Sequence, residues 1–116
     1  MSRKAAEVRG HWGESVAAWW LRLHGWRIVA RRVKLRMGEI DLVAKRGRTI
    51  AFVEVKTRSR REDLDTAIHA WRLRRVAAAA NALAPRFAQH GEDIRIDVIL
   101  VAPFRLPLHI RNAWHG

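Results

Sequence analysis

The sequence contains no cysteine, and this absence excludes disulfide bonds and metal sites built from thiolates. Its charged N-terminus lacks the apolar core of a secretory signal, and the longest apolar runs span only 16–21 and 98–103. A helix that crosses a membrane needs about 20 apolar residues. We therefore expect a cytoplasmic protein with no membrane association.

Repeats, low-complexity tracts and Pro/Gly/Ser-rich linkers are missing as well. A chain of 116 residues is long enough to bury a core and too short for two ordinary domains. We expect one domain over 1–116, with loose residues at 1–6 and a charged mobile loop at 57–63.

Acidic residues are scarce relative to basic ones. The chain has 23 Lys and Arg against 11 Asp and Glu, a net charge of +12, and 19 of the basic residues are arginine. A strongly basic domain most often binds nucleic acid, and arginine suits phosphate. Biased codon usage would explain arginine over lysine, but not the excess of base over acid.

Apolar residues recur at helical spacing over 7–24 and form two stripes. One holds Ala17, Ala18 and Leu21, with Glu14 on the same side. A helix with two apolar sides is buried on two sides, so we expect one side on the domain's own sheet and the other against a second subunit. Gly25 ends this helix. The second stripe is Trp12, Val16, Trp19, Trp20 and Leu23.

Three strands are predicted next, at 27–33, 39–44 and 49–56, with a hairpin turn over 45–48 that contains Gly47. In the second strand, alternation points Ile40 and Leu42 one way and Glu39 and Asp41 the other. In the third strand, Ile50 and Phe52 share a face with Glu54 and Lys56, and Ala51, Val53 and Val55 take the opposite face.

A second helix starts at Asp65 or Thr66 and ends near Ala84, before Pro85. Its buried side consists of Ile68, Trp71, Val76, Ala79, Ala80 and Leu83. The apolar segment 94–101 is a final core strand, covered on both faces. The order α-β-β-β-α-β predicts an α/β fold with a mixed sheet flanked by helices, in which the third and last strands are parallel.

The segment 38–56, GEIDLVAKRGRTIAFVEVK, carries the candidate chemistry. Two-residue spacing puts Glu54 and Lys56 on one face of their strand. A hairpin centred between Gly47 and Arg48 places Asp41 opposite Glu54, so that carboxylates and one lysine converge.

Facing carboxylates repel unless a cation lies between them, and Mg²⁺ or Mn²⁺ accepts such oxygen ligands. Asp41 and Glu54 are the candidate ligands, and the Val55 carbonyl is a third. A metal there would polarise a phosphoryl oxygen, and Lys56 would orient water or stabilise charge. Any one of these acids alone fits a solvated strand face equally well, so the hypothesis depends on the set.

GEIDLVA followed by FVEVKTR resembles the central motif of the YraN-like family of bacterial proteins. As in that family, a helix with Gly10, Glu14, Ala17 and Leu21 precedes it. RIDVI (95–99) and HIRNAW (109–114) resemble the closing segments, so the resemblance extends from about Gly10 to Trp114.

This resemblance implies a restriction-endonuclease-like αβββαβ core, similar to that of dimeric archaeal Holliday-junction resolvases. It implies Asp41 and Glu54 as metal ligands, Lys56 as the catalytic lysine and Glu14 as a further carboxylate of the metal site. One position departs from the family: Leu73 follows the basic Arg72 where a glutamine is expected, which puts full activity in question.

Other residues support a nucleic-acid surface. Arg58, Arg60 and Arg61 follow Lys56 directly, and Arg72, Arg74 and Arg75 extend the basic surface. His69 is a possible phosphate contact, although a surface or capping role is the simpler interpretation. Trp71 is the tryptophan best placed for substrate contact, although burial explains most aromatic residues.

Three functions remain open on the sequence alone. The first is a Mg²⁺-dependent endonuclease or resolvase-like enzyme that acts on DNA as a homodimer. The second is a protein of nuclease fold that binds DNA in recombination, repair or uptake without cutting it. The third is a basic protein associated with RNA or the ribosome.

Overall fold

A computed structural model describes residues 3–57 and 70–114. These described residues form two helices and one five-stranded sheet with the strand order β1-β2-β3-β4-β5. The elements are α1 (Arg3–Leu23), β1 (Arg27–Leu35), β2 (Gly38–Arg46), β3 (Thr49–Thr57), α2 (Ala70–Phe87), β4 (Asp93–Val101) and β5 (Leu108–Ile110). The predicted α/β class and the αβββαβ order are confirmed, and β5 is an addition that the sequence did not predict.

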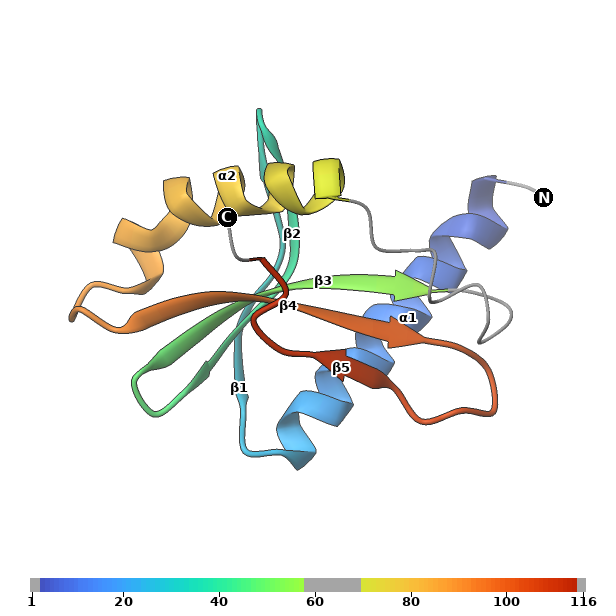
Figure 1. Ribbon diagram of the computed structural model, residues 1–116. Coiled ribbons are helices and arrows are strands. Elements are labelled where there is room, and N and C mark those ends of the chain that lie inside the picture. The colour runs from blue at the N-terminus through green and yellow to red at the C-terminus, as the bar shows by residue number, and fades with distance from the viewer. Residues whose placement is uncertain (1–2, 58–69, 115–116) are drawn as a thin grey trace.

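The two helices cover opposite faces of the sheet, as Figure 1 shows. The α1 face contains Ala51 and Val53 of β3, and the α2 face contains Ile50 and Phe52 of the same strand. This is the alternation predicted for β3. Each face of the central strands is therefore buried under one helix, and both core clusters are closed by β4.

Helix α1 lies on the sheet through its small residues. Ala17, Ala18 and Leu21 are fully buried, whereas Trp12 and Trp19 of the second stripe are 41% and 53% exposed. In one chain this stripe, predicted to meet a second subunit, is thus open to solvent at Trp12, Trp19 and Leu23, whereas Val16 and Trp20 pack partly against the α1-side core. Residues 3–6, expected to be loose, belong to the helix, since no helix breaker precedes Gly10.

Gly25 ends α1, as predicted. Its φ of 84° is left-handed, and the Trp26 amide donates to the Leu21 carbonyl while the Gly25 amide donates to Arg22. These two hydrogen bonds form a Schellman motif, in which a left-handed residue lets the last turn satisfy its free carbonyls. The chain then reverses directly into β1.

The β1–β2 hairpin bends at Arg32 and Asp41, which lie between the paired positions Arg31↔Leu42 and Val33↔Ile40. Arg32 has a φ of 50°, a left-handed conformation that non-glycine residues seldom adopt. Ile40 packs in the α2-side core and Leu42 in the α1-side core. The expectation that these two share a face is wrong, because the bend interrupts the alternation of the strand.

The β2–β3 hairpin has the predicted register. Its turn contains Gly47 with a φ of 59°, and Leu42 pairs with Val53. Glycine at the first central position suits the tight turns that match strand twist. This register points Asp41 toward Glu54, one position beyond the last paired residues.

Strands β3 and β4 are parallel, with Glu54 beside Val98 and Lys56 beside Leu100. Helix α2 makes the crossover between them, as expected for a βαβ unit. Pro85 does not end α2, which continues to Phe87; a proline loses only one amide hydrogen bond, and the last turn tolerates this loss. Val76, Ala79, Ala80 and Leu83 are buried as predicted.

The C-terminal segment is tied to β4 through the fully buried carboxylate of Asp97. Arg95 donates to both Asp97 oxygens at 3.0 Å, His109 lies at 2.7 Å, and the Asn112 amide donates at 3.0 Å. Burial alone would raise the pKa of Asp97, but these hydrogen bonds outweigh burial and hold the pKa below its usual value. The RIDVI and HIRNAW segments therefore meet in one polar network.

No helix within the described residues is both long and apolar enough to cross a membrane.

Candidate metal and nucleic-acid site

Asp41 is positioned where β2 leaves β3. Its Oδ2 accepts a hydrogen bond from the Val55 backbone amide at 2.7 Å, and the regular ladder stops one residue earlier, at Leu42. The Asp41 carboxylate thus takes the place of a backbone acceptor between the two strands. Since the amide and carbonyl of one strand residue point the same way, the Val55 carbonyl faces this gap too.

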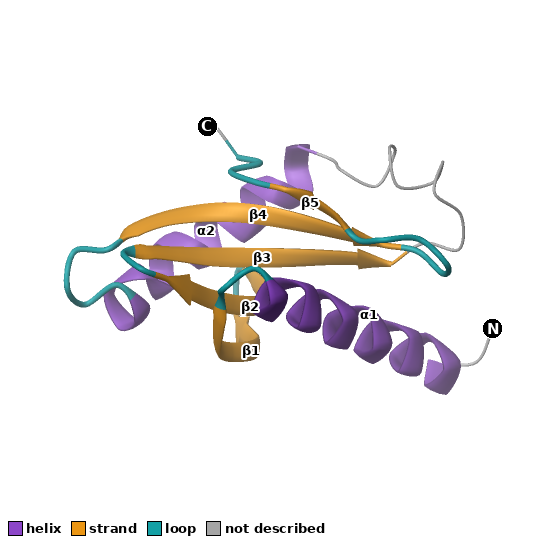
Figure 2. Cartoon of the chain, turned by 90° about the horizontal axis from the view of Figure 1, so that it is seen from below, coloured by secondary structure: helices purple, strands orange, loops and turns teal. Residues whose placement is uncertain are grey.

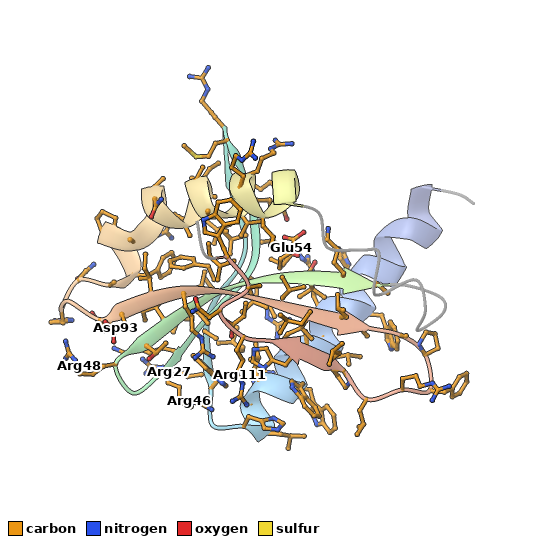
Figure 3. All side chains as sticks on the ribbon, viewed as in Figure 1. Arg27, Arg46, Arg48, Glu54, Asp93 and Arg111 are labelled. Carbon is orange, nitrogen blue, oxygen red and sulfur yellow. The ribbon has the colours of Figure 1, made fainter. Side chains whose placement is uncertain are left out.

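Glu54 comes from β3 and lies on the α2 side of the sheet (Figure 3). Lys56, two residues further along the same strand, shares that face. Both are more than 90% buried, and Lys56 Nζ lies 2.7 Å from Glu54 Oε1. Buried charges are tolerated when they are paired. The predicted proximity of this acid and this lysine is confirmed, and their charges compensate each other directly.

Glu14 reaches the site from α1, on the opposite face. Arg32 Nε donates to Glu14 Oε1 at 2.7 Å, and the arginine is the residue at the β1 bend. The preceding residue, Gly13, lies against Thr57 so closely that a Cβ would overlap the threonine hydroxyl. The close approach of α1 to the end of β3 therefore requires glycine next to Glu14.

The Asp41 carboxylate has the most perturbed environment of the site. Burial and then repulsion from Glu54 raise its pKa to about 8, with smaller contributions from Glu14 and Glu39, against the Val55 hydrogen bond that lowers it. Three further carboxylates therefore act on one carboxylate at the gap between strands. This is a place where a proton or another cation is favoured.

The side chains are not gathered into a finished ligand cluster. Within residues 3–57 and 70–114, no three acidic or histidine side chains are arranged to hold a metal ion together. The reason is geometric: Glu14 is turned onto Arg32, and Glu54 is turned onto Lys56. The donor types suit a hard cation, but binding one would require these ion pairs to rearrange.

The structure describes the side chains of only some of the predicted phosphate-binding arginines. Arg75 is exposed on α2, and its Nε donates to the Met37 carbonyl at the tip of the β1–β2 hairpin, at 3.2 Å. Leu73, at the position that departs from the family, is buried in the α2-side core. Several predicted residues lie outside the described residues or side chains: Arg58, Arg60, Arg61, His69, Trp71 and Arg72.

Sequence reasoning missed two residues of this site. Arg32 is one of many arginines, and the neighbouring sequence does not indicate its left-handed backbone or its ion pair with Glu14, which lies 18 residues away. Gly13 carried a usable signal, because glycine inside a helix is unfavourable and often marks a close contact.

Fold and site together define an α/β protein with a mixed sheet, covered by one helix on each face. Where β2 and β3 part, the protein has an acid–lysine cluster that consists of Glu14, Asp41, Glu54 and Lys56. The family described as "Uncharacterised protein family UPF0102" matches residues 13–101, and the chain belongs to this family.

Curated relatives match over nearly their whole length. UPF0102 proteins from Rhizorhabdus wittichii and Sphingopyxis alaskensis are each 64% identical over 114 residues, which cover 98% of this chain and 97% and 98% of theirs. A UPF0102 protein from Mesorhizobium japonicum is 46% identical over 116 residues, covering 99% of this chain and 93% of the relative. These relatives span both the acid–lysine cluster and the C-terminal segment.

Proposed function

We propose that this protein is a Mg²⁺-dependent endonuclease that hydrolyses DNA phosphodiesters, of the restriction-endonuclease-like and YraN-like kind and similar to Holliday-junction resolvases. The observation that carries the proposal is the Asp41 carboxylate, placed between two strands near Glu54 and Glu14, with Lys56 paired to Glu54. A purely structural role would not require several carboxylates that destabilise one another. We further propose that the protein acts on this DNA in the cytoplasm.

The donor set fits magnesium or manganese. Asp41 and Glu54 would hold the ion, with the Val55 carbonyl and Glu14 as further oxygen donors. A bound ion would supply Lewis-acid stabilisation of the phosphate and a water of lowered pKa. Relief of the repulsion around Asp41 supplies a reason for binding, because the ion replaces the proton that this carboxylate otherwise keeps.

The remaining steps belong to the chain's own groups. Lys56, once released from Glu54, would orient the attacking water or donate to the phosphate oxygens. Exposed arginines on α2, with Arg58, Arg60 and Arg61 after β3, would hold the backbone in place. Such contacts position DNA without reading its sequence, which agrees with a net charge of +12.

The test is cleavage of branched, single-stranded and duplex DNA by the purified chain with Mg²⁺ or Mn²⁺. We expect cleavage that falls at least about 100-fold in Glu54→Gln. The matched control is Asp93→Asn, an exposed carboxylate at the opposite end of the sheet (Figure 3), which should cleave like the wild type. Activity that survives Glu54→Gln would belong to a contaminant.

A second function, DNA binding without cleavage, is favoured by one specific observation. The chain's own cations already neutralise Glu14 and Glu54, so an ion is not needed for charge balance at those two acids. In this case the purified chain would bind the same DNA substrates but leave every one of them intact with either metal.

A further inference from the structure

The connection between β4 and β5 is an exposed apolar loop. Residues 102–107 join Val101 to Leu108, although hairpins close with about 2–5 residues. Within it, Phe104 is 105% exposed and Leu106 is 71% exposed, so neither packs on the chain. Large apolar side chains that gather on one exposed loop form a patch of the kind that meets a partner.

The loop is held in an unfavourable shape. Phe104 has a φ of 59°, a left-handed conformation that bulky residues rarely adopt. Pro107 at the far end is buried and anchors the loop, whereas Pro103 is exposed with the apolar tip. The surrounding backbone therefore keeps the Phe104 ring turned into solvent.

The position of the loop connects it with the acid–lysine cluster. In the parallel β3–β4 pair, Lys56 lies beside Leu100 and Thr57 beside Val101, so the C-terminal ends of both strands lie at the same end of the sheet. The loop starts at that end of the sheet, and Figures 1 and 2 both show it projecting beyond the ends of the two strands. The apolar tip therefore stands at the end of the sheet that carries the cluster.

The charge around the loop indicates which class of partner it would bind. Arg105 is exposed between the two apolar residues, and the sequence from 98 to 114 contains no acidic residue. An apolar tip flanked by positive charge fits a polyanion that also offers flat apolar surface. Unstacked bases of a nucleic acid provide both, because every base has a π face beside its phosphate.

We propose that Phe104 and Leu106 form a wedge that stacks on unpaired bases at a branch or strand end and so directs this protein to branched nucleic acid. This inference rests on the proposed nucleic-acid function and adds the class of substrate. The wedge unstacks the base step next to the phosphate that would meet the cluster. Intact duplex offers no open base to Phe104 and is bound through its phosphates alone.

The experiment measures binding of the full chain to a four-way junction and to a linear duplex of the same length, in EDTA so that no DNA is cut. The junction carries 2-aminopurine at the branch point, whose fluorescence rises when the base unstacks. Phe104→Gly suits a φ of 59° and removes the ring without loss of the fold, which a thermal melt verifies. Leu106→Ser is the second variant.

We expect the double variant to bind the junction about tenfold more weakly or worse, with the fluorescence rise abolished, and to bind the linear duplex within about twofold of the wild type. Val29→Ser, an exposed apolar residue on the edge strand, is the control and should match the wild type. Equal effects on junction and duplex, or none on either, would overturn the wedge.

Two other outcomes separate the wedge from its alternatives. A wild-type chain that binds neither DNA contradicts the proposed function itself, whereas junction binding that ignores the loop variants contradicts only the wedge. Sedimentation with vesicles of phosphatidylcholine and phosphatidylglycerol tests a membrane partner. Vesicle binding lost in the double variant, with junction binding unchanged, would assign the loop to lipid.

Discussion

At the scale of single residues, Asp41 combines a structural and a chemical role. Its side chain replaces the backbone acceptor that β3 loses where β2 turns away, and this fixes it in the gap between strands. The same position leaves it partly desolvated among other acids. The ladder defect and the raised pKa of Asp41 thus have one cause.

The raised pKa predicts how stability depends on pH. The pKa of Asp41 is raised from its ordinary value of 3.8 to about 8 in the folded chain, so the contribution of this one group to stability is fully present below about pH 4 and is lost as the pH rises through about 8. An asparagine at this position cannot ionise, and its side-chain oxygen can still accept from Val55. At pH 8 we expect Asp41→Asn to have a higher melting temperature than the wild type, with a free energy of unfolding that is greater by at least about 1 kcal/mol. At pH 4 we expect this difference to disappear.

Thermal melts from pH 4 to pH 9 in EDTA measure this difference, and Asp93→Asn, which removes an exposed carboxylate, is the matched control. Adding Mn²⁺ at pH 8 should raise the melting temperature of the wild type but not of Asp41→Asn, because the ion binds the ionised carboxylate. A constant difference between Asp41→Asn and wild type across the pH range would contradict the raised pKa.

Residues of the site were predictable where the backbone followed a regular rule. Asp41 and Glu54 could be matched because Gly47 marks the hairpin turn and strand alternation then fixes the register. The Glu14–Arg32 ion pair could not be predicted, since it depends on a left-handed arginine at a bend. Sequence offers no signal for such strain when the residue is neither glycine nor asparagine.

At the scale of elements, the placement of α1 depends on one missing side chain. Gly13 lets the helix approach the end of β3, and the next residue is the Glu14 that acts on Asp41. The alanines at 17 and 18 continue the close contact along the sheet. The small-residue stripe of α1 thereby determines how near Glu14 comes to the other acids.

Gly13→Ala tests this contact. Alanine favours a helix over glycine by about 1 kcal/mol, but its Cβ would collide with Thr57, so we expect a net loss of about 1–3 kcal/mol in the free energy of unfolding. Chemical denaturation measures the loss, with the exposed Ser15→Ala as a control on the same helix.

A second substitution separates collision from other causes. Thr57→Ala removes the hydroxyl that lies where the new Cβ would be, so Gly13→Ala combined with Thr57→Ala should be more stable than the sum of the two single effects predicts. Additive effects would mean that α1 does not press against β3 at this point.

The sequence predicted elements whose pattern is local and regular. The order of helices and strands followed from hydrophobic periodicity, and the parallel β3–β4 pair followed from the strand–helix–strand crossover that α2 makes between them. It did not predict β5, because three residues are too short for a periodic signal, and β5 depends on the distant Asp97 network. Nor did it predict the bend that separates Ile40 from Leu42, for the reason given for Arg32.

At the scale of the whole molecule, α1 leaves part of its apolar surface in contact with solvent. Trp19 and Leu23 of the tryptophan stripe are 53% and 60% exposed, whereas Val16 and Trp20 of the same stripe pack partly against the α1-side core. We propose that a second copy of the chain covers this stripe, as the two-faced helix predicts. Two such helices packed face to face would bury aromatic area that one chain leaves in water.

Multi-angle light scattering tests the dimer. We expect the wild type to have twice the chain mass of 13.4 kDa and Trp19→Ser to have the mass of one chain at the same concentration. Val29→Ser, which exchanges an exposed apolar residue elsewhere, should stay dimeric. A wild type that is monomeric at micromolar concentration, or a Trp19→Ser that stays dimeric, would sink this proposal.

The parallel pairing of β3 with β4 also orders events during protein synthesis. Every member of the acid–lysine cluster precedes position 57, whereas β4 begins at Asp93. Because a ribosome adds about 5–20 residues per second, the nascent chain carries all of these side chains for seconds before the strand that closes both core clusters exists. The cluster acquires its buried environment only after β4 has been synthesised, so a product terminated before Asp93 would contain the same reactive groups without the burial that perturbs them.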